Sequence, residues 1–295
     1  MPELPEVEVL VHHLAPLLRG RRVDAVEVLR AKVIGRDTPA GLRERLVGAR
    51  CVGLRRRGKY LVFEFAGKGR ANRFQALGHL GMTGRMYLQP ATAARPRHAA
   101  VVLRLGRHDF VYEDPRYFGR FGVDLRPLDR LGPEPLESGF AAGYALAQLQ
   151  RSRQPIKVRL LDQGFVAGVG NIYASEILFR AAIDPRRRSD SLREDEVRRV
   201  VRYTREVLRT AIRCGSTVPL DWTGRAGRDR LFYYGRAEAA PDYYTERLQV
   251  YDRADQPCHR CDTPIRRIEQ AGRSTYFCPQ CQPRTASRRP ATNPA

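Results

Sequence analysis

The chain begins with a proline at position 2 and a carboxylate at position 3, in the stretch MPELPEVE. If Met1 is removed, Pro2 becomes a terminal secondary amine, and the reference pKa of an α-amino group, about 8, leaves a neutral nucleophilic fraction at pH 7. Such an amine adds to an aldehyde-like sugar carbon to give an iminium ion, which has no nitrogen proton to lose and persists as an electron sink. Glu3 is placed to move protons as a general acid or base. The alternative is an ordinary helix start with proline in its lead-in.

Four cysteines form the second candidate site. They make two CxxC pairs, Cys258 with Cys261 and Cys278 with Cys281, a spacing that brings four thiolates around one tetrahedral ion. Four protein ligands leave no position for water, so the pattern predicts one structural Zn²⁺ and no catalytic metal. Two disulfides are the alternative, which the lack of a secretory signal disfavours. His259 in place of one cysteine is another.

The residues between the cysteine pairs predict a β-hairpin. Strand character at 265–268 and 274–277 is interrupted by Gly272 and Arg273, so the turn would present an arginine to a polyanion. The remaining cysteines, Cys51 and Cys214, are expected to be small buried apolar residues rather than reactive thiols.

Hydrophobic periodicity predicts the elements that position these residues. A helix is expected over 5–19, because apolar residues recur at helical spacing and Gly20 follows the last turn. The pattern over 140–214 is helical, and Ser191 and Glu194 have the spacing of a capping box. The segment 216–246 has no clear period and is expected to be a loop. Short β-branched and aromatic runs predict strands of a sandwich or barrel at 51–57, 60–65, 100–105 and 110–112.

A glycine-flanked segment within the helical region is a candidate anion site. Gly168 and Gly170 permit a tight turn, and Asn171 is expected to cap the helix that follows, with Ile172 and Phe179 on its buried face. A helix N-terminus preceded by glycines is suited to hold a phosphate group.

The composition points to the class of partner. The 53 Lys and Arg against 32 Asp and Glu give a net charge of +21, spread along the chain, which indicates a polyanionic partner. Neither an apolar run of membrane-spanning length nor a signal segment is visible. We therefore expect a cytoplasmic protein that binds nucleic acid, with no role at a membrane.

Six blocks of sequence, in this order, resemble the bacterial formamidopyrimidine-DNA glycosylases over roughly residues 2–282. They are PELPEVE at 2–8, RRGKYL at 56–61, HLGMTG at 79–84, DPRYFG at 114–119, AGVGNIYASE at 167–176 and the paired CxxC knuckles. The resemblance implies an α+β multidomain fold. An N-terminal β-sandwich with flanking helices is expected over 1–132, a helical domain with a helix–two-turn–helix motif and a lid loop over 133–245, a zinc-finger β-hairpin over 246–283, and a disordered tail over 284–295.

The resemblance also implies an activity. The chain would be a bifunctional DNA glycosylase and abasic-site lyase that removes 8-oxoguanine and formamidopyrimidines from damaged duplex DNA by β,δ-elimination, acting as a monomer. By resemblance the catalytic residues are Pro2 as nucleophile, Glu3, Lys59 and Arg273; DNA contacts come from His79, Arg116, Lys157 and Asn171; and Met82, Arg116 and Phe118 fill the space that the extruded base leaves. Arg116 would also bind the orphaned cytosine.

Two alternatives remain open at this point. An endonuclease VIII-like enzyme for oxidised pyrimidines shares the proline and the zinc finger, although the PELPEV and DPRYFG blocks favour the purine enzyme. A non-catalytic zinc-ribbon nucleic-acid-binding protein would also explain the charge and the cysteines, but it would have no use for a free terminal proline.

Overall fold

The computed structural model describes residues 2–67, 72–215 and 247–284. The chain divides into two compact units, the first comprising Met1–Leu131 with Ala211–Glu246 and the second Gly132–Thr210 with Arg247–Ala295. The loop expected over 216–246, including the predicted lid, lies outside the described residues. The same holds for the tail from residue 285 onward. Within the described ranges, no helix combines the length and the apolar character needed to cross a membrane.

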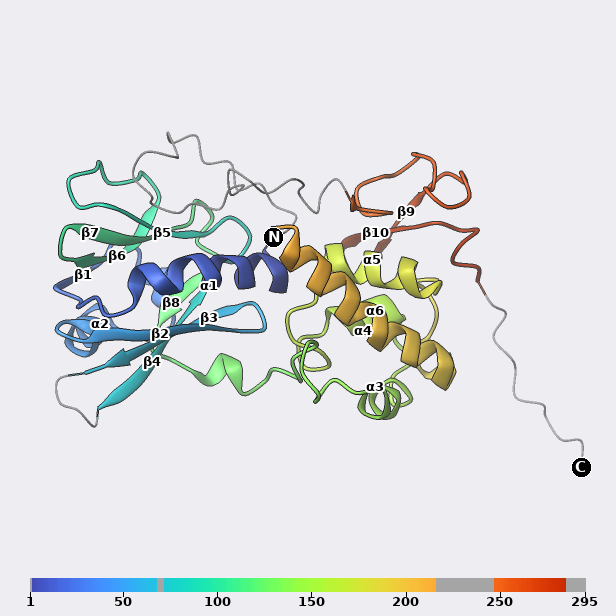
Figure 1. Cartoon of the computed structure of the whole chain (residues 1–295), viewed down its shortest axis with the longest axis horizontal. Coiled ribbons are helices and arrows are strands. Elements are labelled where there is room, and N and C mark those ends of the chain that lie inside the picture. Colours follow the sequence, from blue (N-terminus) through green and yellow to red (C-terminus); the bar gives the residue numbers. More distant parts are fainter. Residues whose placement is uncertain (1, 68–71, 216–246, 285–295) are drawn as a thin grey trace, which may run out of the picture. The chain divides into compact units, whose positions relative to one another are not determined.

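Helix α1 (Leu4–Leu18) opens the first unit and matches the helix predicted over 5–19 within one residue. Its apolar stripe is fully buried, with Val7, Leu10 and Leu14 between 0% and 1% exposed. The helix ends before Gly20, whose φ of 82° lies in the left-handed region that glycine adopts without a Cβ clash. The amphipathic pattern thus fixes which face of α1 joins the core of the first unit. Figure 1 shows this helix lying along the strands.

The first unit is a β-sandwich, as predicted. In the described part of the chain it has two four-stranded antiparallel sheets whose inner faces share one hydrophobic core. Phe63 lies at the centre, with its ring centroid 5.5 Å from that of Phe110 in the other sheet and 5.5 Å from that of Phe121 in its own. One sheet has the order β2 (Arg50–Arg57), β3 (Tyr60–Ala66), β4 (Arg73–His79), β8 (Arg120–Gly122), and the other β1 (Ala25–Val28), β6 (Ala99–Leu105), β7 (His108–Glu113), β5 (Arg85–Pro90).

Shorter helices lie between β1 and β2 and after β8. They are η1 (Ala31–Ile34), α2 (Pro39–Leu46) and η2 (Arg126–Leu128). The Thr38 side chain caps α2 by accepting the backbone N–H of Gly41 at 3.0 Å, and Pro39 occupies the first turn, where a missing N–H costs nothing.

The second unit is helical, as the sequence predicts for 140–214. It contains α3 (Ala142–Leu149), α4 (Ile156–Leu161), α5 (Asn171–Ala181), η3 (Ser189–Ser191) and most of α6 (Glu194–Arg213). The predicted capping box of α6 is wrong. The Ser191 hydroxyl donates to the Arg188 carbonyl at 2.8 Å, and the Glu196 carboxylate instead accepts the Arg193 N–H at 2.9 Å. The helix therefore begins later than that spacing indicated.

The predicted hairpin between the cysteine pairs is confirmed. Strands β9 (Arg266–Gln270) and β10 (Arg273–Phe277) are antiparallel, with Arg273 paired to Gln270 across the turn. Ala271 and Gly272 form that turn with φ of 49° and 69°, the pair of positive values that a two-residue hairpin loop of the primed type requires.

Candidate active site and metal centre

The Glu3 carboxylate is held by the first turn of α1. Glu3 is 1% exposed and occupies the N-cap, where its side chain accepts the backbone N–H of Glu6. In return the Glu6 side chain accepts the Glu3 N–H at 2.9 Å. This reciprocal pair satisfies two helix N–H groups and fixes the position of the carboxylate directly beside Pro2, which is also buried.

Lys59 is placed by the turn between β2 and β3. Gly58, with a φ of 56°, makes that turn, and Lys59 follows it with only 8% of its surface exposed, so the lysine is not a solvated loop residue. The Arg56 guanidinium stabilises the turn, because it donates to the Gly58 carbonyl at 3.2 Å and forms an ion pair with Glu8 of α1. The turn that carries Lys59 is thereby tied to the helix that carries Glu3.

His79 lies beside this turn and is neutral at physiological pH. It is the register partner of Tyr60 on the neighbouring strand, and the two ring centroids are 4.8 Å apart. Burial, with Lys59 and Arg120 nearby, lowers the pKa of His79 to about 4, against a smaller opposing effect of Asp114. The imidazole Nδ1 accepts the Gly81 N–H at 3.1 Å, which leaves Nε2 as the protonated donor.

Two adjoining loops of the first unit carry the predicted void-filling residues. We call residues 81–84 and 115–119 the wedge loops. Met82 on one and Phe118 on the other are 45% and 52% exposed, unusual for large apolar side chains beside a complete core. Arg116 is exposed next to them, with its guanidinium 4.9 Å from the Phe118 ring centroid. The wedge loops therefore present two apolar side chains and one arginine together to solvent.

In the second unit, Lys157 and Asn171 lie against the zinc hairpin. The Lys157 ammonium is fully buried and donates to Asn171 Oδ1 at 2.6 Å, to the Ser274 carbonyl at 2.9 Å and to Thr275 Oγ1 at 2.8 Å. The Asn171 amide donates to the same Ser274 carbonyl at 2.9 Å. Asn171 is the first residue of α5, and its side chain does not cap the helix. The predicted cap is therefore wrong. Arg273, next in sequence to Ser274, is exposed.

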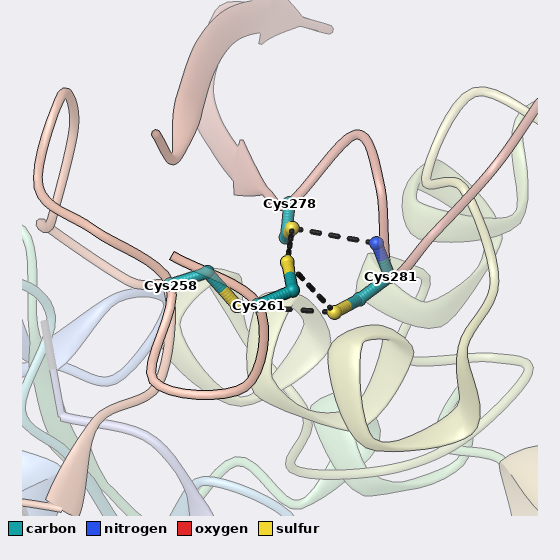
Figure 2. A group of neighbouring side chains, drawn as sticks. All are labelled: Cys258, Cys261, Cys278 and Cys281. Atoms are coloured by element: carbon teal, nitrogen blue, oxygen red, sulfur yellow. Dashed lines mark hydrogen bonds between the residues drawn. The ribbon is translucent and has the colours of Figure 1, made fainter. Parts of the chain in front are cut away.

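The four predicted zinc ligands meet in one cluster (Figure 2). All four Sγ atoms lie within 4.8 Å of one another, and neighbouring sulfurs are 3.5 to 3.8 Å apart. A tetrahedral ion with Zn–S bonds of about 2.3 Å has S–S edges of about 3.8 Å, so the cluster fits one structural zinc. Backbone N–H groups of Arg260 and Cys281 donate to Cys258 Sγ and Cys278 Sγ at 3.5 and 3.4 Å. The cluster also packs on Phe179 of α5.

The predicted residues thus form a group in each unit. Pro2, Glu3, Lys59, His79 and the wedge loops belong to the first unit, and Lys157, Asn171, Arg273 and the cysteines belong to the second. Of the two other cysteines, Cys51 is buried as predicted, whereas Cys214 is half-buried.

Sequence reasoning missed two buried carboxylates. Asp114 is fully buried beneath the wedge loops, although it is the first residue of the DPRYFG block. Glu176 on α5 accepts the backbone N–H groups of Gln249, Val250 and Tyr251, each at 2.9 Å, and burial raises its pKa against the effect of these bonds. An acid inside an otherwise apolar helical run was the available signal for Glu176.

Models of known families match along nearly the whole chain. The formamidopyrimidine-DNA glycosylase N-terminal domain matches residues 1–121, the formamidopyrimidine-DNA glycosylase H2TH domain matches 131–220, and the zinc finger found in FPG and IleRS matches 255–284. The matches follow the sandwich, the helices and the cysteine hairpin in order.

Curated relatives and solved structures agree with these models. A formamidopyrimidine-DNA glycosylase of Thermus thermophilus is 42% identical over 291 residues, which cover 96% of this chain and 98% of the relative. That of Carboxydothermus hydrogenoformans is 36% identical over 282 residues, covering 96% and 100%. A complex of the Lactococcus lactis Fpg with abasic-site DNA has a TM-score of 0.83 at 30% identity, covering 96% and 100%.

The predicted fold class, with a β-sandwich, a helix–two-turn–helix domain and a zinc-finger hairpin, is confirmed by these matches. The resemblance noted in the six blocks of sequence is confirmed by the same findings. The chain belongs to the formamidopyrimidine-DNA glycosylase family.

Proposed function

We propose that this protein removes 8-oxoguanine and formamidopyrimidines from damaged duplex DNA and then cleaves the strand by β- and δ-elimination. The observation that carries the proposal is the buried Glu3 carboxylate, fixed by the helix N-terminus directly beside Pro2. Support comes also from solved relatives at 30 to 31% identity, which were studied with carbocyclic 8-oxo-G-containing DNA and with Fapy-dG-containing DNA. The setting we propose is the bacterial cytoplasm, with the protein acting as a monomer.

The chemistry requires an uncharged amine at Pro2 after loss of Met1. The Pro2 nitrogen attacks C1′ of the damaged nucleotide and loses its proton as the base departs. The C1′–O4′ bond then breaks while O4′ takes up a proton, which gives the iminium ion. The iminium ion makes a C2′ proton acidic, and loss of that proton expels the 3′ phosphate. Glu3 exchanges protons with the sugar and the departing base. Lys59 contributes a positive charge beside the sugar-phosphate, which its burial makes more effective than a solvated lysine would be.

Access to C1′ requires that the damaged base leave the stack, at a cost of a few kcal/mol. We propose that Met82 and Phe118 enter the vacated space and that Arg116 hydrogen-bonds the orphaned cytosine. Their exposure on adjoining loops suits this task, since wedge side chains must be available to enter the duplex. The planar fork of Arg116 matches the acceptors of a base edge, which the point charge of lysine does not.

Contacts to the phosphates position the DNA without reading its sequence. We assign them to His79, Asn171 and Arg273. Lys157 takes part indirectly, through Asn171 and the hairpin. His79 offers Nε2–H, and Arg273 is exposed at the start of β10. The three ammonium protons of Lys157 already have acceptors within the protein, so the direct phosphate contact that the resemblance implies would require an exchange of partners. The zinc hairpin supports this group because Ser274 and Thr275 belong to β10.

The test is covalent trapping with borohydride on a duplex that contains 8-oxoguanine opposite cytosine. We expect an adduct that peptide mapping places on Pro2, and mass spectrometry of the active protein should show that Met1 is absent. Pro5→Ala is the matched control, because it changes a proline of the same helix start and leaves the terminal amine intact.

Three results would count against this assignment. Binding without any adduct would favour the non-catalytic zinc-ribbon protein, and an adduct on a lysine would remove the role of Pro2. Excision of oxidised pyrimidines in preference to 8-oxoguanine in a parallel assay would favour the endonuclease VIII-like activity.

A further inference from the structure

We propose that Asp114 is a positioning residue that joins the two wedge loops into one rigid unit, so that Met82, Arg116 and Phe118 enter the duplex together. The inference rests on the proposed function, because it concerns how the duplex is opened. It assigns the first residue of the DPRYFG block a task distinct from those of Arg116 and Phe118.

The Asp114 carboxylate contacts both wedge loops. One oxygen, Oδ1, accepts the Thr83 hydroxyl at 2.6 Å from the first loop and the Arg116 N–H at 3.2 Å from the second. The other, Oδ2, accepts the Gly119 N–H at 2.9 Å and the Tyr112 hydroxyl at 3.3 Å. Burial alone would raise the pKa of Asp114, but the hydrogen bonds from Thr83, Gly119 and Arg116 lower it below the ordinary value, so the carboxylate is ionised. Hydrogen bonds to an ionised buried acceptor are among the stronger ones.

The backbones of the two loops are also in direct contact. A Cβ placed on Gly81, whose φ is 61°, would lie 2.5 Å from the Gly119 nitrogen. A Cβ on Gly119 would lie 2.3 Å from the His79 carbonyl oxygen and 2.2 Å from the Tyr112 hydroxyl. Neither position leaves room for a side chain, so the two loops can pack this closely only because residues 81 and 119 are glycines. Asp114 then links the same two segments by hydrogen bonds.

Tyr112 ties the Asp114 carboxylate to the sandwich core, and the other donors belong to the loops. The donors to Asp114 from the loops are Thr83, Arg116 and Gly119, and the side chains they position are exposed. Insertion of three side chains into a duplex is more effective when their relative positions are fixed in advance, because less freedom is lost at the moment of binding. The Arg116 N–H bond to Asp114 also fixes the point from which the arginine reaches the orphaned base.

Thr83→Val is the decisive variant. It removes the hydroxyl that joins the first loop to Asp114 and keeps the β-branched shape, so the fold is preserved, while Thr83→Ser retains the donor. We expect Thr83→Val to lower kcat/KM for excision of 8-oxoguanine opposite cytosine by about tenfold, the size expected for one bond to a charged group. The preference for cytosine over adenine opposite the lesion should fall, and Thr83→Ser should restore it.

Two further measurements separate this role from others. Asp114→Asn should show the same losses more strongly, and Asp109→Asn serves as its matched control, since Asp109 is a buried acid of the preceding strand that pairs with Arg104. Borohydride trapping on a single-stranded abasic oligonucleotide, which has no orphaned base, should be unchanged in Thr83→Val.

The results of these assays distinguish failure of the Asp114 inference from failure of the proposed function. Wild-type excision and opposite-base preference in Thr83→Val would overturn the inference. An equal loss on the duplex and on the single strand would also overturn it, because the damage would then reach the chemistry itself. Failure of the wild-type protein to trap any abasic substrate would instead refute the proposed function.

Discussion

Replacement of Lys157 by methionine distinguishes a residue that touches DNA from one that holds the residues that do. The fully buried ammonium donates to Asn171 Oδ1, the Ser274 carbonyl and Thr275 Oγ1. In Lys157→Met the Ser274 carbonyl keeps the Asn171 amide at 2.9 Å, whereas Asn171 Oδ1 and Thr275 Oγ1 lose a donor. A buried acceptor left without a partner, here Thr275 Oγ1, costs about 1–3 kcal/mol, and the half-buried Asn171 Oδ1 costs less.

The loss of the charge offsets part of this cost. Burial of an ammonium carries a desolvation penalty of several kcal/mol, which methionine does not have. We therefore expect the free energy of unfolding to fall by about 2 kcal/mol, visible as a decrease of roughly 5 °C in the midpoint of calorimetric unfolding.

The DNA-binding assay then separates the two roles. The logarithm of the binding constant falls with the logarithm of salt concentration, with a slope of about −0.9 for each phosphate contact. We expect Lys157→Met to weaken binding with the slope unchanged, because Lys157 acts through Asn171 and the hairpin. Arg273→Ala is the comparison, and it should make the slope shallower by about 0.9.

A slope for Lys157→Met that is as shallow as that of Arg273→Ala would refute this reasoning, because it would mean that the Lys157 ammonium itself neutralises a phosphate. Unchanged unfolding together with unchanged binding would refute it as well.

The other predictions concern the chemistry, the wedge, the metal and the core. Glu3→Gln keeps an oxygen for the Glu6 N–H, so we expect near-normal thermal stability and retained DNA binding. Base excision in single-turnover assays should be slower by about 10²–10⁴-fold, and a normal excision rate would remove Glu3 from the mechanism. Arg116→Ala should reduce discrimination for cytosine opposite the lesion in kcat/KM measurements, and an unaltered preference would contradict its role. Removal of zinc with a chelator should abolish DNA binding measured by fluorescence anisotropy, because the cysteine cluster supports the strands next to Lys157 and Asn171. DNA binding that survives verified loss of the metal would count against that support. Phe63→Ala should lower the free energy of unfolding by about 3–5 kcal/mol in urea titrations, and a loss under 1 kcal/mol would mean that the core closes over the cavity.

The sequence correctly predicted the helices and strands whose signals lie within their own residues. Helix α1 has an apolar stripe, a proline in its first turn and a glycine after its end, and each signal acts within a few residues. The cysteine hairpin is equally local, since the CxxC spacing and the Ala271–Gly272 turn lie within one short segment. Strands β2, β3, β6 and β7 were predicted from their β-branched and aromatic residues.

Strands β1, β4, β5 and β8 were missed for a physical reason. In β4 the buried residues Phe74 and Ala76 alternate with Arg73 and Gln75, so the strand is as polar as a loop when only its composition is considered. Its assignment depends on pairing with the preceding strand β3 and with β8, and β8 is distant in sequence. Strand β8 has only three residues, too few for any periodicity.

For the candidate site, the sequence likewise predicted residues that lie in local motifs but not their partners from distant parts of the chain. The motif blocks named Glu3, Lys59 and the wedge residues as candidates, but did not indicate the hydrogen bonds that hold them. Asn171 was predicted as a cap because the helix begins there, whereas its side chain binds Lys157 and a carbonyl of the hairpin more than 100 residues away. Such partners are set by the tertiary fold, and local spacing does not contain them.

The suppressed basicity of His79 has a consequence for how the protein responds to acidification. Its pKa of about 4 lies below the ordinary value of 6.5, so between these two limits the unfolded chain takes up a proton that the native protein does not. Native stability from this residue is complete above pH 6.5 and declines as the pH falls toward 4. Across the range in which most histidines gain charge, the His79 imidazole therefore keeps one protonation state and one set of hydrogen-bonding roles. The phosphate contact proposed for His79 should accordingly not change between mildly alkaline and mildly acid conditions.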